Sequence, residues 1–193
     1  DFPYPFLERR TDTRYRLEGF LFPDTYEVSR NMSPEEIIGM MLRRFAEVFK
    51  EDYVRRAEEL GMSVYDVVTL ASVIEKEAKK PEERSIVSSV FHNRLKRGMK
   101  LESCATVQYA LGTVKQRLTV EDTRYPSPYN TYLHPGLPPG PISCPGEAAI
   151  RAALFPADTE YLYFVARPDG SHVFSRTLTE HDRARVELNG EAP

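Results

Sequence analysis

The spacing of hydrophobic residues along the chain predicts a mainly helical protein. Three long stretches carry apolar residues at helical intervals: 34–60, 64–78 and 82–97. The first is expected to break near Glu51. Ser63 and Asp66 form a capping pair at the start of the second stretch. Pro81 ends that helix because proline has no N–H donor, and Gly98 ends the next one because glycine suits the position after a helix.

Shorter elements complete the prediction of an α+β fold. Further helices are expected at 105–111, 145–155 and 179–188. Residues 161–176 have the alternation of a β-hairpin around a Pro-Asp-Gly turn, and 17–28 has the aromatic and β-branched residues of two short strands. The segment 125–145 holds seven prolines and is expected to be an ordered loop. We therefore expect a helical body with a small antiparallel sheet, in which 17–28 can join the hairpin.

Length and charge restrict the classes of function. A chain of 193 residues is long enough for one compact unit, so 1–193 is expected to be a single domain. The net charge is only −3, and no stripe of Lys and Arg alternates with aromatic residues, so nucleic acid is not an expected partner. No apolar run approaches the roughly 18 residues that cross a bilayer. Composition alone leaves the cellular compartment open.

Cysteine and histidine give no sign of a metal site. Cys104 and Cys144 are the two cysteines, and neither a CxxC nor an HExxH pattern occurs. The four histidines are not spaced as metal ligands. We expect neither a metal nor a cofactor.

One carboxylate on the 64–78 helix has an unusual position. At about 100° per residue, the apolar residues of this helix cluster on one side and Glu75 falls among them, whereas Glu77 falls almost opposite, beside Lys76 and Lys79. We expect Glu77 to face solvent. A carboxylate on an apolar stripe is costly, so Glu75 either pairs with a nearby cation for structural reasons or serves as a catalytic acid in a reaction that the spacing does not name. Helical spacing does not decide between these two roles.

Eight short motifs, taken in order, suggest a family. They are LEGFLFPDTY (17–26), LASVIEKE (70–77), VFHNRL (90–95), SPYNTY (127–132), GLPPGPI (136–142), AALFP (152–156), YLYFVAR (161–167) and GSHVFSRT (170–177). Each is modest alone, but in this order over some 160 residues they are specific. The chain resembles the endolytic murein transglycosylases of the YceG-like family.

This resemblance implies a bacterial enzyme anchored in the cytoplasmic membrane, acting on nascent peptidoglycan strands at its extracytoplasmic face. It implies that the first glutamate of the LASxxEKE motif, Glu75, is catalytic. The implied reaction cleaves the bond between N-acetylmuramic acid and N-acetylglucosamine and leaves a 1,6-anhydro end, without adding water. The membrane anchor is absent from this sequence, and 1–16 is expected to be a remnant of an upstream LysM-like region or a linker. Cell-wall synthases are candidate partners.

The resemblance also suggests residues that contact the glycan. In SPYNTY, the rings of Tyr129 and Tyr132 would contact sugar faces, and the polar groups of Ser127, Asn130 and Thr131 would bind hydroxyl or acetamido groups. Alternatively, these side chains fasten the proline-rich loop to the body.

Two more candidates come from other motifs. Glu18 is placed near the site by resemblance, but it could instead pair with a neighbouring arginine. Asn93 could orient the cleft, or it could cap or pair at the surface of the third helix.

Two departures from the family pattern involve cysteine. Relatives commonly have sequences similar to SDPT and SNPG where this chain has Ser103-Cys104-Ala105-Thr106 and Ser143-Cys144-Pro145-Gly146. Because the family implies an oxidising compartment, we expect a disulfide between Cys104 and Cys144.

Two rival functions remain open from the sequence. A hydrolytic muramidase would need, besides Glu75, either an activated water or a second carboxylate, for which Glu18, Asp24 and Glu102 are candidates. A non-catalytic peptidoglycan-binding module would need the tyrosines but no catalytic glutamate.

Overall fold

The computed structural model describes residues 2–7, 10–115 and 117–189. Its helices are α1 (Pro34–Val48), α2 (Glu51–Glu59), α3 (Val64–Glu77), α4 (Arg84–Lys96), α5 (Cys104–Leu111), α6 (Glu147–Leu154) and α7 (Leu178–Asn189), with 3-10 turns at Pro81–Glu83 and Asp122–Arg124. Strands β1 (Tyr163–Ala166) and β2 (His172–Ser175) pair antiparallel. The predicted α+β class, with a helical body and a hairpin within 161–176, is confirmed.

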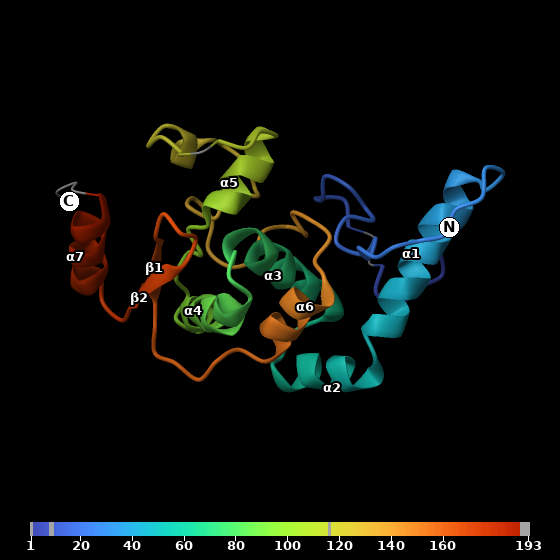
Figure 1. The fold of residues 1–193 in the computed structure, drawn as a ribbon, viewed down its shortest axis with the longest axis horizontal. Coiled ribbons are helices and arrows are strands. Elements are labelled where there is room, and N and C mark those ends of the chain that lie inside the picture. The colour runs from blue at the N-terminus through green and yellow to red at the C-terminus, as the bar shows by residue number, and fades with distance from the viewer. Residues whose placement is uncertain (1, 8–9, 116, 190–193) are drawn as a thin grey trace.

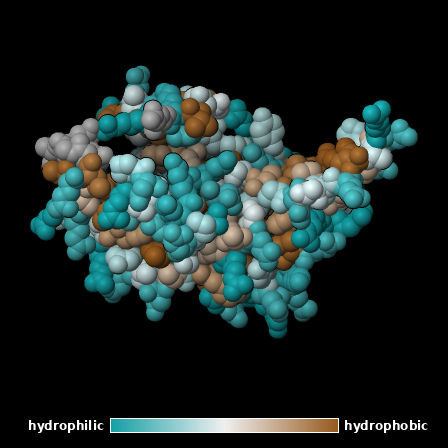
Figure 2. Space-filling model, in the orientation of Figure 1, coloured by the Kyte–Doolittle hydropathy of each residue, from teal (hydrophilic) through white to brown (hydrophobic). Residues whose placement is uncertain are grey.

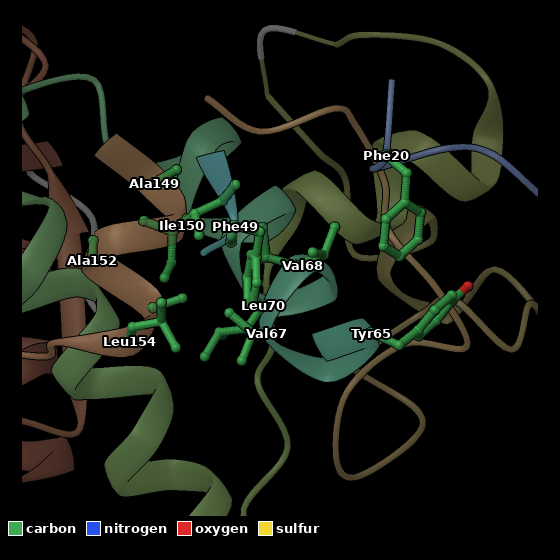
Figure 3. Close-up of a cluster of buried hydrophobic side chains, with 14 of the residues drawn as sticks. Phe20, Phe49, Tyr65, Val67, Val68, Leu70, Ala149, Ile150, Ala152 and Leu154 are labelled. Carbon is green, nitrogen blue, oxygen red and sulfur yellow. The ribbon is translucent and has the colours of Figure 1, made fainter. Parts of the chain in front are cut away.

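Helix α3 lies at the centre of the molecule (Figure 1). It packs most extensively against α6 and also contacts α2, α4 and α5. Figure 3 shows side chains of α3, among them Val67 and Leu70, close to Ile150 and Leu154 of α6. Tyr65 and every residue from 67 to 74 are buried, which leaves the middle of α3 without a solvent-exposed face. An amphipathic helix buries one face and exposes the other. An α-helix that is covered on all sides, as α3 is, instead forms the centre of the core.

Local capping residues determine where α1 and α3 start. Ser33 and Ser63 each accept a hydrogen bond from the backbone N–H three residues on, and the acidic side chain at that third position bonds back. Both capping boxes satisfy donors that a helix start leaves unpaired. The predicted interruption near Glu51 is confirmed, since α1 ends at Val48 and α2 begins at Glu51.

Residues 17–28 correct one prediction, because they form turns and irregular extended chain instead of strands. Among the described residues the sheet contains only β1 and β2. Phe20 and Phe22 are buried in the helical core, so the aromatic pattern reflects packing and not a strand ladder. Gly19 has a φ of 91°, and a Cβ there would lie 2.5 Å from Cγ of Pro141. Glycine is therefore required where this segment crosses the proline-rich loop.

The N-terminal segment takes part in the core. The ring of Phe6 lies 5.5 Å from that of Phe20 and 4.8 Å from that of Phe45, and Leu7 is buried. The interpretation of 1–16 as a remnant of an upstream region stays a prediction, and residues 1, 8 and 9 lie outside the described part.

The proline-rich loop 125–145 is irregular, as predicted, apart from an isolated bridge between Gly136 and Lys100. Within the ranges that the structure covers, no helix is both long and apolar enough to cross a membrane.

Candidate active site

Three pockets that share lining residues form one groove along the end of α3. The α5 pocket, of about 670 Å³, lies between the C-terminal end of α3 and α5. The hairpin pocket, of about 530 Å³, is lined by residues of α4, β1 and α7, and it shares Glu77 and Cys104 with the α5 pocket. The loop pocket, of about 240 Å³, shares Arg14 and Tyr109 with the α5 pocket. Figure 2 shows a mostly hydrophilic face that is hollowed beneath the α5 region. A groove made of three adjoining pockets suits an extended ligand.

Glu77 lies where the two larger pockets meet. One carboxylate oxygen, Oε1, accepts hydrogen bonds from the hydroxyl of Ser103 and from the backbone N–H of Ala105, at 3.2 Å for the latter. Ala105 is in the first turn of α5, where free N–H groups favour a negative charge. Glu77 is half-buried and held in place, so the expectation that it is a solvated surface residue was wrong.

Glu75 occupies a different side of α3. Its Oε2 accepts a hydrogen bond of 3.2 Å from the backbone N–H of Gly146, the residue that precedes α6. Its Oε1 lies 3.8 Å from Nη2 of Arg84. Glu75 lines neither of the two larger pockets. This arrangement matches the structural ion pair that the sequence left open as an alternative.

Glu18 is tied to the wall of the groove through Tyr109. The hydroxyl of Tyr109, which lines the α5 pocket, donates a hydrogen bond to Oε2 of Glu18. Burial raises the pKa of the Glu18 carboxyl, while the Tyr109 hydroxyl and the charge of Arg14 partly oppose that rise. Burial and the carboxylate also raise the pKa of the Tyr109 phenol. Glu18 therefore positions Tyr109 from behind the groove wall.

Substitution of Glu18 should have a pH-dependent effect on stability. A carboxyl whose pKa is raised in the folded state disfavours folding when it is ionised, and this cost disappears as the pH falls below the ordinary value of 4.5. Glu18→Gln keeps an acceptor for Tyr109 and removes the charge. We expect the variant to melt at a higher temperature than the wild type at pH 7, and the difference to shrink at pH 4. Thermal melts at both pH values test this, and a difference that grows on acidification would contradict it.

The SPYNTY motif is mostly interior, which favours the alternative in which its polar side chains fasten the loop to the body, and sugar contact by this motif stays a prediction. Asn130 is fully buried; its Nδ2 donates to the backbone oxygens of Thr123 and Tyr125, and its Oδ1 accepts from the backbone N–H of Tyr132. Thr131 is buried, and its hydroxyl bonds to Thr106 and Ser103. These atoms are already satisfied, so they fasten the loop to the body.

The tyrosines of the motif have different surroundings. Tyr129 is buried, and its hydroxyl accepts from the backbone N–H of Arg14, although part of it lines the loop pocket together with Ser127. Tyr132 lines the hairpin pocket, where Glu77 also lies. Tyr132 is thus the tyrosine of this motif that shares a pocket with Glu77.

Asn93 is a structural anchor instead of a groove residue. Its Nδ2 donates to the backbone oxygens of Thr159 and Tyr161, at 2.8 Å and 3.0 Å. These bonds fasten the segment that leads into β1. The neighbouring Arg94 is buried; it donates to the backbone oxygens of Leu162 and Lys100 and forms an ion pair of 2.9 Å with Glu102.

The two cysteines are free thiols, so the expected disulfide is not formed in the structure. Cys104 lies at the start of α5, with its sulfur 3.3 Å from the hydroxyl of Tyr132. The sulfur of Cys144 accepts a hydrogen bond from the backbone N–H of Gly19. Each thiol has a separate partner on a different segment, and burial raises the pKa of both thiols.

Several residues of the groove carried no signal in the sequence. Tyr109 and Arg14 meet at the groove wall, where Nη1 of Arg14 donates to the backbone oxygen of Tyr109 at 2.9 Å. Their separation along the chain gives no periodicity that could have paired them. Among the described residues, no group of three or more His, Cys, Asp or Glu side chains is arranged to hold a metal ion.

Comparison with known proteins connects this groove to a family. The YceG-like family matches residues 5–187. The endolytic murein transglycosylase of Bacillus subtilis strain 168 is 42% identical over 89% of this chain and 48% of its own length. A protein of the same name from Streptococcus pneumoniae strain D39 is 36% identical over 88% of the chain and 32% of its own length.

A solved structure agrees with the fold. The crystal structure of a yceG-like protein from Listeria monocytogenes superposes with a TM-score of 0.85 at 41% identity, covering 91% of this chain and 57% of the other. The present chain spans about half the length of the Bacillus relative. With the family matched over nearly its whole length, the chain belongs to the YceG-like family.

Proposed function

We propose that this chain is the catalytic part of an endolytic murein transglycosylase, a lyase that cuts peptidoglycan glycan strands. The names of the Bacillus and Streptococcus relatives support the enzyme class. Because peptidoglycan lies outside the cytoplasmic membrane, the site of action is extracytoplasmic. In the full-length protein, a membrane-anchoring segment outside this sequence would hold the enzyme near nascent strands and cell-wall synthases.

We further propose Glu77, in place of Glu75, as the catalytic acid and base. The observation that carries this choice is the position of Glu77 at the junction of the α5 and hairpin pockets. A strand lying in the groove would extend to both sides of this carboxyl group, as cleavage inside a strand requires. Glu75 is engaged with Gly146 and Arg84 on another side of α3.

The chemistry needs one carboxyl group in two roles. Protonated Glu77 donates its proton to the glycosidic oxygen as the bond from that oxygen to C1 of N-acetylmuramic acid breaks. The resulting carboxylate accepts the proton of the C6 hydroxyl of the same sugar, and O6 forms a bond to C1. The products are a free hydroxyl on the leaving sugar and a 1,6-anhydro end, with Glu77 protonated again. Because the attack is intramolecular, no water needs to be positioned.

A hydrolytic muramidase is the second candidate function. Glu102 lines the hairpin pocket together with Glu77, and its backbone has an unusual φ of 52°. A second carboxylate in the same pocket could activate water in the manner of a two-carboxylate glycosidase. However, the Glu102 carboxylate is already engaged in an ion pair of 2.9 Å with the buried Arg94.

Product analysis distinguishes these functions. The protein is incubated with purified peptidoglycan strands, and the new ends are identified by mass spectrometry. We expect 1,6-anhydro ends, whose mass is lower than that of reducing ends by one water. Reducing ends would show the hydrolytic muramidase, and the absence of new ends would favour a binding module.

A further inference from the structure

The two large pockets on either side of Glu77 differ in charge. Besides Glu77, the charged side chains lining the α5 pocket are all cationic: Arg14, Lys76, Lys79 and Lys115. The hairpin pocket instead mixes the two signs, with Glu102 and Asp182 beside Arg94 and Arg185. The whole chain has a net charge of −3, so the α5 pocket is a local departure from the overall balance. Cations gathered on one side of a groove attract anionic groups to that side.

The cations of the α5 pocket differ in how far they are neutralised. Lys115 forms an ion pair of 2.6 Å with Asp122 and, together with hydrogen bonds from Thr119, lowers the pKa of that carboxyl to about 2. Lys76 and Lys79 are exposed, and neither has an ion-pair partner among the carboxylates that the structure describes. Nη1 of Arg14 donates a hydrogen bond to the backbone oxygen of Tyr109, and Cζ of Arg14 lies 5.5 Å from the centre of the Tyr109 ring. Lys76 and Arg14 also interact electrostatically with the Glu18 carboxylate behind the groove wall, but among the described residues neither forms an ion pair with it, so both lysines can meet an anion in the pocket.

We propose that the α5 pocket binds the carboxylates of the peptide stem attached to N-acetylmuramic acid, with Lys76 and Lys79 as the residues that select for them. This inference rests on the proposed function. In peptidoglycan the stem branches from the muramic acid, the sugar whose C1 is attacked, so a stem must lie beside the catalytic carboxyl group. The volume of about 670 Å³ is large enough for several amino-acid residues.

The position of the lysines favours stem carboxylates over phosphate. The pyrophosphate of a lipid carrier occurs only at one end of a nascent strand, whereas every muramic acid in the strand can carry a stem. A pocket directly beside the cleavage site of an enzyme that cuts inside strands meets a stem at each productive binding event. Lysines are also suited to carboxylates spaced along a peptide, because each ammonium is a point charge on a flexible chain. Binding of the stem would fix which muramic acid C1 lies next to Glu77.

The test compares strands with charged and neutral stems. Soluble strands of one length are divided, and in one half the stem carboxylates are converted to amides, which keeps the size of the stem and removes its charge. We expect wild-type kcat/KM to be about fivefold higher on the charged strands, from the two solvent-exposed ion pairs of Lys76 and Lys79. In the variant Lys76→Gln/Lys79→Gln the ratio should fall to about one.

A matched control removes two charges outside the groove. Lys50 and Lys96 are exposed and line none of the three groove pockets. The variant Lys50→Gln/Lys96→Gln should keep the wild-type ratio. An unchanged ratio in Lys76→Gln/Lys79→Gln would overturn the proposal. A second pattern would also overturn the proposal. In it the wild type cleaves both strands equally, and inorganic pyrophosphate inhibits the wild type but not Lys76→Gln/Lys79→Gln. The pocket would then bind phosphate.

A binding measurement separates this inference from the proposed function. Free stem peptide, with and without amidated carboxylates, is titrated into the wild type and both double variants, and heat or chemical-shift changes are recorded. We expect weak binding of the charged peptide that only Lys76→Gln/Lys79→Gln loses. If strands are not cut but this pattern holds, the catalytic proposal fails and the pocket assignment stands. If strands are cut but no variant affects the charged peptide, the pocket assignment fails alone.

Discussion

Glu77→Gln is expected to lower the rate at which 1,6-anhydro ends form by about a thousandfold, in the range typical of losing a general acid and base. Glutamine has nearly the same shape and can still accept the hydrogen bonds from Ser103 and Ala105. It cannot release a proton to the leaving oxygen, and it cannot take one from the C6 hydroxyl. Both halves of the reaction therefore fail while the start of α5 stays capped. Mass spectrometry of products and a thermal melt on the same sample measure the two effects.

The matched control is Glu75→Gln, two residues away on the same helix. This substitution weakens a partly exposed ion pair with Arg84 of 3.8 Å, which is worth about 0–1 kcal/mol, and it leaves an acceptor for the N–H of Gly146. We expect cleavage to stay within a few-fold of the wild type. The opposite pattern, with activity lost in Glu75→Gln and kept in Glu77→Gln, would show that the carboxyl group facing Gly146 is the catalytic one.

The helical wheel of α3 shows where sequence reasoning succeeds and where it stops. Capping residues and helix breakers are local, and they predicted the starts of α1 and α3 and the end of α3 closely. The assignment of faces assumed that one side of α3 meets solvent. In the fold, α6 and α5 cover sides that a wheel cannot distinguish, so Glu75 and Glu77 are both half-buried. Which of them meets the groove depends on contacts with Gly146 and Ser103, and no periodicity encodes these contacts.

The groove as a whole could not be predicted because its walls come from distant parts of the chain. Arg14, Glu77, Tyr109 and Tyr132 come together there from four separate segments. The resemblance identified the motif segments but not the role of each side chain. SPYNTY is an example, since a motif with two tyrosines and one asparagine suits a sugar site and a loop anchor equally. Only burial separates these roles, and burial depends on tertiary packing.

Asn130→Ala is expected to lower the free energy of unfolding by about 3 kcal/mol, because a buried amide that makes three hydrogen bonds to the backbone is lost. The backbone oxygens of Thr123 and Tyr125 and the N–H of Tyr132 would be left without this partner. Ser127→Ala is the control in the same loop, because its half-buried hydroxyl accepts one bond from the N–H of Tyr129 and its loss should cost about 1 kcal/mol or less.

Urea unfolding of both variants, with glycan affinity measured well below the unfolding transition, tests this prediction. For Asn130→Ala we expect the midpoint to fall clearly while the folded fraction binds strands nearly as tightly as the wild type. An unchanged midpoint together with a large loss of affinity would instead place the Asn130 amide in contact with sugar. Because Asn130 is completely buried and both its amide nitrogen and its oxygen are engaged, a loss of stability is the outcome that the fold requires.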